Sequence, residues 1–317
     1  NYSLANEINV PVIDHLIPNF ETNNEIDFEY NEISSLIYTS GTTGKPKGVM
    51  ISNENILSNV NGIRNIFKDI KPTTSLNILP WAHIYSQTCE LYYNILYDNK
   101  IALSSGKENF INECKEIRPD IIYIVPRVLE MVKSKLDFLD KPLIRKVLPL
   151  LISKLFGGNL ITIFTGGAKL DKNTRNFFLD NGVSICEGYG CTETSPMVSV
   201  NHITNPRNEE SVGFLLDKVL IEIINEEICV SGPNVMKGYW GNEKATKEVL
   251  IKKDDKIFYR TGDKGHIENN FLFYEGRIKE NYKLSNGKFV NVLEVEEKIK
   301  DYVKGNFIIF GENMEYN

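Results

Sequence analysis

Short apolar runs and amphipathic segments alternate through the middle of the chain. One amphipathic segment follows the strand-like stretch GVMIS, and Ser52 or Asn53 stands where it can cap the first turn of a helix. The apolar residues of this segment recur every three or four positions, as one face of a helix requires: Ile56, Leu57, Val60, Ile63 and Phe67. The pattern predicts a short strand followed directly by a helix.

Two later segments repeat this order of strand and helix. Residues 121–125 read as a buried strand, and Pro126 follows at the first turn of a helix, where proline is well tolerated. Another strand runs to Phe164, and the next helix is capped by Asp171 and ends at Gly182. Strands that alternate with helices favour a mostly parallel sheet covered by helices.

The pattern changes after about Ser211. KVLIEIINEEICVSG predicts a hairpin that turns at Asn225–Glu226, and GHIENNFLFYEG predicts a second that turns at Asn269–Asn270. Beyond Arg277 the chain is rich in charge, and the amphipathic NVLEVEEKIKDYV with the strand-like NFIIF is too little to bury a core alone. We therefore expect an α/β fold in which parallel sheets flanked by helices and an antiparallel β subdomain form a large domain over 1–276. Residues 277–317 would be the start of a second, small α+β domain.

The amino-acid composition narrows the classes of function that this chain can have. The chain has 317 residues, of which 42% are hydrophobic and 25% charged, as in an ordinary folded protein with a large core. A net charge of -6, a pI near 5.5 and the lack of a long basic run disfavour a nucleic-acid binder. The five cysteines lack a CxxC pair and the four histidines lack metal-ligand spacing. We expect a reduced compartment, either the cytoplasm or the surface of an intracellular membrane.

The loop YTSGTTGKPKG, residues 38–48, gathers glycines, hydroxyls and two lysines with little side-chain bulk. Backbone N–H groups freed by glycine, together with hydroxyls and ammonium groups, form a cradle for anions. The spacing is not that of GxxxxGK[ST], because Pro46 stands where that pattern needs another residue type. Taken alone, the loop is also compatible with a flexible surface hairpin.

Further stretches follow this loop in a fixed order, and the ordered set resembles the adenylate-forming superfamily. That superfamily includes acyl-CoA synthetases, luciferases and the adenylation domains of peptide synthetases. The resemblance extends from about residue 30 to about residue 300, and GRIKENYKLSNGKFV is most like long-chain fatty acyl-CoA synthetases. The supporting stretches are PWAHIYSQ (80–87), TGGAKL (165–170), EGYGCTET (187–194), YRTGDKG (259–265) and GRIKENYKLSNGK (276–288).

The resemblance implies that a carboxylate attacks the α-phosphorus of ATP, which gives an acyl-adenylate and pyrophosphate before a thioester forms with CoA. The carboxylate is already ionised at neutral pH, since carboxyl pKa values lie near 4. The reaction therefore needs alignment and charge compensation rather than a general base. ATP, Mg²⁺ and CoA are the implied ligands. The implied phosphate contacts are Thr39, Ser40, Gly41, Thr42, Thr43, Gly44, Lys45 and Lys47.

The resemblance also assigns nucleotide contacts. Tyr189 would stack on adenine, Thr192 would contact the α-phosphate, and Asp263 would accept hydrogen bonds from the ribose hydroxyls with Arg277 assisting. Glu193 would hold Mg²⁺, and Lys47, Thr192 and Glu193 are the implied catalytic residues. The full implied AMP-binding set is Gly166, Gly167, Ala168, Gly188, Tyr189, Gly190, Thr192, Asp263 and Arg277. Taken singly, Tyr189 could be a core aromatic, Glu193 a solvated carboxylate and Asp263 a turn residue.

Three further residues match positions outside the nucleotide site. His83 matches the edge of the acyl pocket, Lys279 matches the hinge at which the small domain rotates, and Gly287 matches the path of the CoA pantetheine arm. A lone histidine beside apolar residues is more often structural than catalytic, and Lys279 could be an ordinary exposed lysine.

The substrate is expected to be a hydrophobic acid, because PWAHIYSQ offers no carboxylate for the ammonium group of an amino acid. The sequence predicts a long-chain fatty acid–CoA ligase, a ligase of fatty acid metabolism whose partners are ATP, a fatty acid and CoA. The alternatives are a non-catalytic nucleotide- or acyl-binding relative and an adenylating enzyme for another acid. The family's C-terminal lysine and most of the portion before the loop have no counterpart here, so we expect part of a longer protein. Peripheral membrane association and oligomeric state stay open.

Overall fold

The computed structural model describes residues 31–39, 46–71, 73–137, 146–204 and 207–278, with short pieces at 282–283, 289–290, 295 and 298–299. Within this part of the chain no helix is long and apolar enough to cross a membrane. The predicted phosphate contacts 40–45, the hinge residue Lys279 and the CoA-path residue Gly287 lie outside the described residues. The strand NFIIF and most of the helix before it lie outside them as well.

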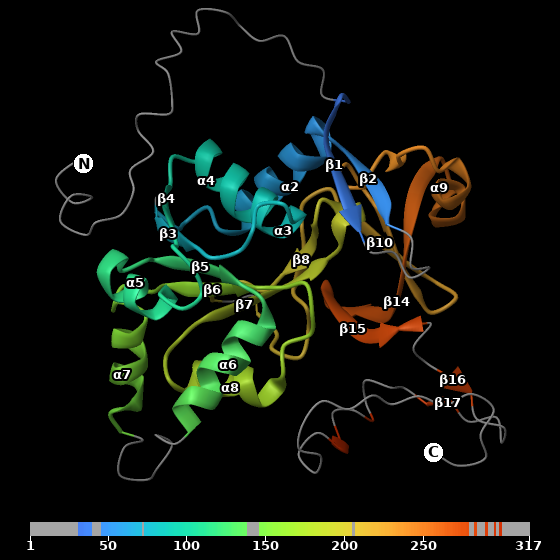
Figure 1. The fold of residues 1–317 in the computed structure, drawn as a ribbon. Helices are drawn as coiled ribbons and strands as arrows, with labels where there is room; N and C mark the ends of the chain where they lie inside the picture. Colours follow the sequence, from blue (N-terminus) through green and yellow to red (C-terminus); the bar gives the residue numbers. More distant parts are fainter. Residues whose placement is uncertain are drawn as a thin grey trace, which may run out of the picture.

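A parallel sheet forms the centre of the first half of the fold (Figure 1). Its strands lie side by side in the order β4–β3–β5–β6–β7. β5 and β6 are buried at every position, which explains their continuous apolar runs. The strands are β3 (Thr74–Asn77), β4 (Lys100–Leu103), β5 (Ile121–Ile124), β6 (Thr162–Thr165) and β7 (Ile185–Gly190).

Helices cover both faces of this sheet (Figure 1). Successive residues of β5 serve opposite sides: Ile121 and Tyr123 pack with the cluster that holds α2, whereas Ile122 and Ile124 pack with the cluster of α5 to α8. The helices on the α2 side are α2 (Asn53–Ile66), α3 (Ile84–Ser86), the π-helix η2 (Gln87–Tyr92) and α4 (Tyr93–Leu96). Those on the other side are α5 (Phe110–Ile117), α6 (Pro126–Leu136), α7 (Leu148–Leu155) and α8 (Lys172–Asp180).

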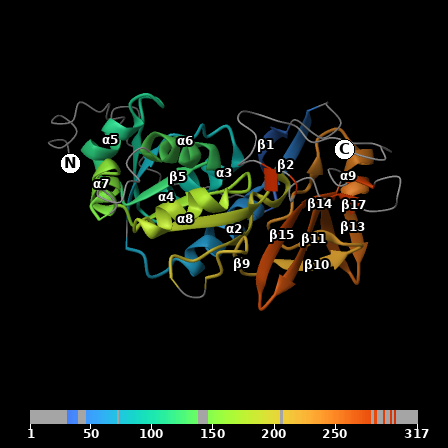
Figure 2. The same ribbon diagram turned by 90° about the horizontal axis from the view of Figure 1, so that it is seen from below.

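The same sheet continues into antiparallel strands (Figure 2). β8 pairs with β7, and the two-residue β9 then joins β8 to β15, because Phe214 pairs with Val200 on one side and with Phe271 on the other. β14, β11 and β10 follow in that order, and β13 pairs with β14. The strands are β8 (Met197–Val200), β9 (Phe214–Leu215), β10 (Leu220–Ile224), β11 (Glu227–Ser231), β13 (Leu250–Lys253), β14 (Lys256–Glu268) and β15 (Phe271–Arg277). The parallel and antiparallel halves therefore share one sheet.

A small antiparallel sheet carries the two ends of the predicted phosphate loop. Thr39 ends β1 and Lys47 begins β2, and the two residues are direct partners across these strands. β12 pairs with the other edge of β2, and α9 follows it. The elements are β1 (Ile33–Thr39), β2 (Lys47–Ser52), β12 (Gly238–Tyr239) and α9 (Glu243–Val249), with a separate pair β16 (Tyr282–Lys283) and β17 (Phe289–Val290).

The predicted caps and turns are confirmed. Ser52 and Asn55 form a capping box at α2, and Asp171 accepts a hydrogen bond from the Thr174 backbone N–H at 2.8 Å. The hairpin β10–β11 turns at Asn225 and Glu226, both with positive φ, and β14–β15 turns at Asn269–Asn270 in the same way. Local sequence therefore determined where these elements begin and end.

Candidate functional site

Tyr189 and Asp263 lie 74 positions apart in the sequence and are directly bonded. The Tyr189 hydroxyl donates a hydrogen bond to Asp263 Oδ2 at 2.6 Å. Arg277 pairs with Asp263 across β14 and β15, and its Nε lies 3.1 Å from Asp263 Oδ1. The Asp263 side chain is 6% exposed and lies within a strand, so the alternative of a turn residue does not describe it. Three predicted AMP contacts therefore meet at one point.

Burial and neighbouring charges determine the protonation states of Tyr189 and Arg277. Burial raises the pKa of Tyr189 well above its usual range, and the Asp263 carboxylate raises it further, so the phenol stays a donor. Partial burial by itself lowers the pKa of Arg277, but Asp263 together with Tyr274, Cys191 and Tyr189 outweighs that effect and the pKa rises overall. Arg277 also donates to the Thr261 carbonyl at 3.1 Å. The carboxylate is thus held between a permanent cation and a neutral phenol.

The predicted glycines lie where backbones approach closely. A Cβ on Gly166 would stand 3.1 Å from the Gly188 carbonyl oxygen, and one on Gly190 would stand 1.8 Å from the Pro196 carbonyl oxygen. Gly166 is buried at the end of β6, whereas Gly167 and Ala168 are exposed. The glycines therefore let β7 lie close to the end of β6 on one side and to the residue before β8 on the other, and they keep the wall beside Tyr189 free of side chains.

Glu193 belongs to a second group, four residues beyond Tyr189. The Tyr239 hydroxyl donates to Glu193 Oε1 at 2.8 Å, and the Met236 N–H donates to the Glu193 carbonyl at 2.9 Å. The Lys47 ammonium lies 5.0 Å from the centre of the Tyr239 ring. The structure thus brings two of the three predicted catalytic residues to one tyrosine, which the sequence analysis did not single out.

A buried amide network holds the segment that carries Thr192 and Glu193. These residues begin the 3₁₀ turn η4 (Thr192–Thr194). Asn59 of α2 donates to the Thr194 carbonyl at 3.1 Å and accepts from the Met197 N–H at 2.8 Å. Asn59 also donates to the Met197 carbonyl at 3.3 Å, and Asn234 donates to the same two carbonyls, Thr194 and Met197. An asparagine on the apolar face of α2 was the available sequence signal for this network.

The residues present are suited to bind a Mg²⁺ ion that phosphate groups also bind. Among the described residues no three His, Cys, Asp or Glu side chains gather into a metal-binding group. Mg²⁺ is usually held by one or two carboxylates together with substrate phosphates and water, so a protein cage is not required. Glu193 supplies one such carboxylate, and within the described part of the chain its Oε2 receives no hydrogen bond.

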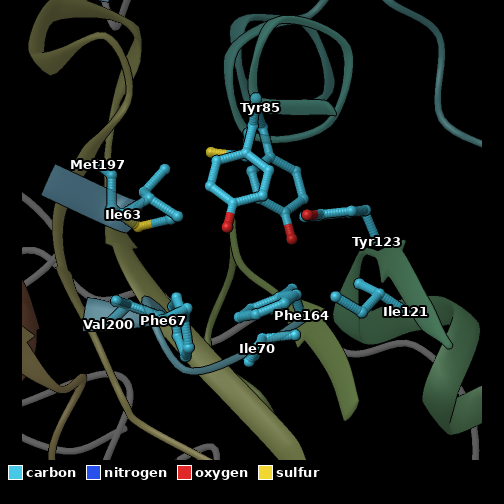
Figure 3. Close-up of a pocket in the computed structure, with 11 residues that line it drawn as sticks. Ile63, Phe67, Ile70, Tyr85, Ile121, Tyr123, Phe164, Met197 and Val200 are labelled. Atoms are coloured by element: carbon cyan, nitrogen blue, oxygen red, sulfur yellow. The ribbon is translucent and has the colours of Figure 1, made fainter. Parts of the chain in front are cut away.

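An apolar cavity of about 20 Å³ lies between α2, the α3–η2 segment and the sheet (Figure 3). Tyr85 and Tyr123 point their hydroxyls into its middle, and Phe164 and Met197 close it from the sheet. The lining residues are Ile63, Phe67, Ile70, Tyr85, Cys89, Tyr93, Ile121, Tyr123, Phe164, Met197 and Val200. His83 lies at the N-cap of α3 with an exposed side chain and does not line this cavity, whereas Tyr85 does.

Residues 9–240 match the family model for AMP-binding enzymes. The chain belongs to the AMP-binding enzyme family. Its relatives include the probable 4-coumarate–CoA ligase 1 of Dictyostelium discoideum, 33% identical over 263 residues that cover 77% of this chain and 44% of the relative. They also include the human long-chain-fatty-acid–CoA ligase ACSBG1, which is 28% identical over 323 residues that cover 85% of this chain and 44% of the relative. The chain spans about half the length of the curated relatives it matches.

Solved structures of other proteins share the fold of this chain. The ATP-bound RpMatB–BxBclM chimera B1 superposes with a TM-score of 0.73 at 25% identity, covering 88% of this chain and 54% of the other. O-succinylbenzoate CoA synthetase (MenE) from Bacillus subtilis, in complex with ATP and magnesium ion, superposes with a TM-score of 0.72 at 22% identity. The superposition covers 92% of this chain and 60% of the MenE chain. The α/β fold predicted from the alternation of strands and helices is confirmed.

Proposed function

We propose that this chain is the nucleotide-binding part of an AMP-forming acid–CoA ligase. The enzyme would join a carboxylic acid to AMP, release pyrophosphate and then transfer the acyl group to CoA. The observation that carries the proposal is the meeting of separate motifs at one place. Tyr189, Asp263 and Arg277 form one bonded group, and Glu193, four residues beyond Tyr189, shares the neighbour Tyr239 with Lys47.

The roles follow from the chemistry of each side chain. The Tyr189 ring offers a face to adenine, and the buried Asp263 carboxylate accepts hydrogen bonds from ribose hydroxyls. Lys47 supplies charge for the phosphates, and Thr192 offers a hydroxyl to the α-phosphate. Glu193 would hold Mg²⁺, which neutralises phosphate charge when bound. The acid needs no base, since it is ionised at neutral pH.

The acid is proposed to be hydrophobic, and a long-chain fatty acid is the first candidate. The cavity is walled almost entirely by apolar and aromatic side chains, which suit an acyl group that leaves water. Its volume of about 20 Å³ is near that of one water molecule, so a long chain must displace lining side chains as it enters. Motif resemblance and the fatty-acid ligases among the relatives support this candidate.

An aryl acid is the second candidate, and the ring content of the cavity favours it. Five of the lining side chains are aromatic, and the rings of Tyr123 and Phe164 stack with centres 5.3 Å apart. Such walls suit a flat ring through stacked and edge-to-face contacts. The 4-coumarate–CoA ligases of Dictyostelium discoideum among the relatives support the same candidate.

Acid-dependent exchange of pyrophosphate into ATP tests the proposal in the full-length protein. Fatty acids of several lengths, aryl acids and amino acids are compared, with Glu193→Ala as the control. We expect exchange with one class of hydrophobic acid and its loss in Glu193→Ala. If no acid supports exchange while ATP still binds, the ligase proposal is wrong and a non-catalytic binding protein remains.

A further inference from the structure

Tyr239 is fixed to the strand that leaves the phosphate loop. In the β12–β2 pair, Tyr239 lies opposite Val49 and Gly238 lies opposite Met50. Two more backbone hydrogen bonds extend this pairing, from the Trp240 N–H to the Gly48 carbonyl at 2.8 Å and from the Lys237 N–H to the Met50 carbonyl at 3.0 Å. The position of the Tyr239 ring is therefore set by β2, which begins at Lys47.

The same short segment holds Glu193 at two points. The Met236 N–H binds the Glu193 backbone carbonyl, and the Tyr239 hydroxyl binds one oxygen of its side chain, Oε1. Tyr239 is only 5% exposed, so its ring cannot swing away without opening the core.

Two side chains of opposite charge contact different parts of the Tyr239 side chain. Lys47 lies over its face at a distance typical of a cation–π contact, and Glu193 binds its hydroxyl. In the described part of the chain neither Lys47 nor Glu193 forms an ion pair, although they share this neighbour. The two charged groups therefore contact the same side chain without pairing with each other in the described part of the chain.

We propose that Tyr239 is a positioning residue that aims Glu193 at the metal of metal–ATP and keeps Lys47 apart from Glu193. The hydrogen bond occupies Oε1 and leaves Oε2 of Glu193 for the metal. This inference rests on the proposed function, because the metal and the phosphates belong to ATP. It adds a residue from the Gly-Tyr-Trp segment, 238–240, that none of the motif assignments includes.

Tyr239→Phe is the decisive variant, since it keeps the ring and the lysine contact and removes only the hydrogen bond. The first readout is binding of Mn²⁺ in the presence of ATP, followed by electron paramagnetic resonance. We expect Mn²⁺ affinity to fall about tenfold, as loss of a charge-assisted hydrogen bond predicts, with metal-free ATP affinity unchanged. The second readout is exchange activity, in which saturating Mg²⁺ restores most of the maximal rate.

Tyr97→Phe is the matched control, because its hydroxyl donates to Asn61 at 2.7 Å on the surface. This control should leave Mn²⁺ affinity unchanged. Combining Tyr239→Phe with Glu193→Gln completes a double-mutant cycle, in which a residue acting through Glu193 has no further effect.

Unchanged Mn²⁺ affinity in folded Tyr239→Phe, or an equal loss in the Glu193→Gln background, overturns the inference. Unchanged Mn²⁺ affinity in Glu193→Gln alone overturns it too, whether or not the tyrosine variant folds. Failure of the proposed ligase function is a separate result, because it is seen as absent exchange while metal–ATP binding remains measurable.

Discussion

The hydroxyl of Tyr189 is bonded to Asp263 Oδ2 at 2.6 Å, so the residue proposed to face adenine is tied to the residue proposed to face the ribose. A ribose hydroxyl that binds Asp263 Oδ2 shares that oxygen with the Tyr189 hydroxyl, and two donors on one carboxylate oxygen each bind it more weakly than one donor alone. We therefore expect an exchange at Asp263, in which one hydrogen bond weakens as another forms, so the net gain is smaller than a count of new contacts suggests.

Tyr189→Phe tests this exchange. The ring remains for stacking and the competing donor is lost, so we expect AMP affinity, measured by calorimetry, to stay equal or to rise by up to about fivefold. Tyr189→Ala removes the ring and should weaken binding by about tenfold or more, as base–aromatic stacking is worth ~1–3 kcal/mol. A weaker AMP complex in Tyr189→Phe would mean that the hydroxyl helps to bind the nucleotide.

The raised pKa of the buried Glu90 predicts that the stability of the folded protein depends on pH. Its side chain is buried in the π-helix η2, and burial raises its pKa from 4.5 to about 7, although Asn77 donates a hydrogen bond to Oε2. The folded protein thus binds more protons than the unfolded chain between these values, so the free energy of unfolding falls as pH rises from 4.5 to about 7. The loss is on the order of 3 kcal/mol and is complete above that range.

Urea unfolding at several pH values measures this slope, and Glu90→Gln is the comparison. The amide mimics the protonated acid, so the variant should lose this part of the pH dependence and match or exceed the wild type at pH 8. Parallel curves for the two proteins would show that Glu90 titrates alike in the folded and unfolded states.

Asn59→Ala should be strongly destabilising. The change leaves the Thr194 and Met197 carbonyls and the Met197 N–H with fewer partners in a buried place. We expect the free energy of unfolding to fall by about 2–4 kcal/mol. Asn65→Ala, in the same helix but bonded to Asp217 at the surface, is the control and should cost less than about 0.5 kcal/mol. Equal losses would argue against the network.

The cavity predicts a change in acid preference. Tyr85→Ala removes one aromatic wall, so larger acids should gain relative to smaller ones, by about tenfold in the ratio of exchange rates. ATP affinity should not change. Leu96→Ala, at an exposed position of α4, is the control. An unchanged ratio in Tyr85→Ala would place the acyl group elsewhere.

Local structure was predictable because its causes are local. Ser52 caps α2 through a neighbour three residues away, and Asn269–Asn270 turns a hairpin through its own backbone conformation. The family motifs added Tyr189, Asp263 and Arg277, which the structure brings together, although no pattern along the chain links them.

Tyr239 and Asn59 were not predictable in the same way. Tyr239 reaches Glu193 across 46 positions, and Asn59 reaches Thr194 across 135, so no local pattern reports either contact. The sequence also did not predict that the parallel and antiparallel strands form one sheet. The strand that joins them, β9, has only two residues, which is too short for a strand pattern. Such features depend on how distant segments pack.

The Tyr189–Asp263 hydrogen bond joins two strands that are not neighbours in the sheet. Tyr189 lies on β7 and Asp263 lies on β14, and β8, the two-residue β9 and β15 stand between these strands in the sheet order. A nucleotide that binds both residues would therefore span the parallel and antiparallel halves of the sheet. We expect the affinity for the nucleotide and the curvature of the sheet between β7 and β14 to be coupled.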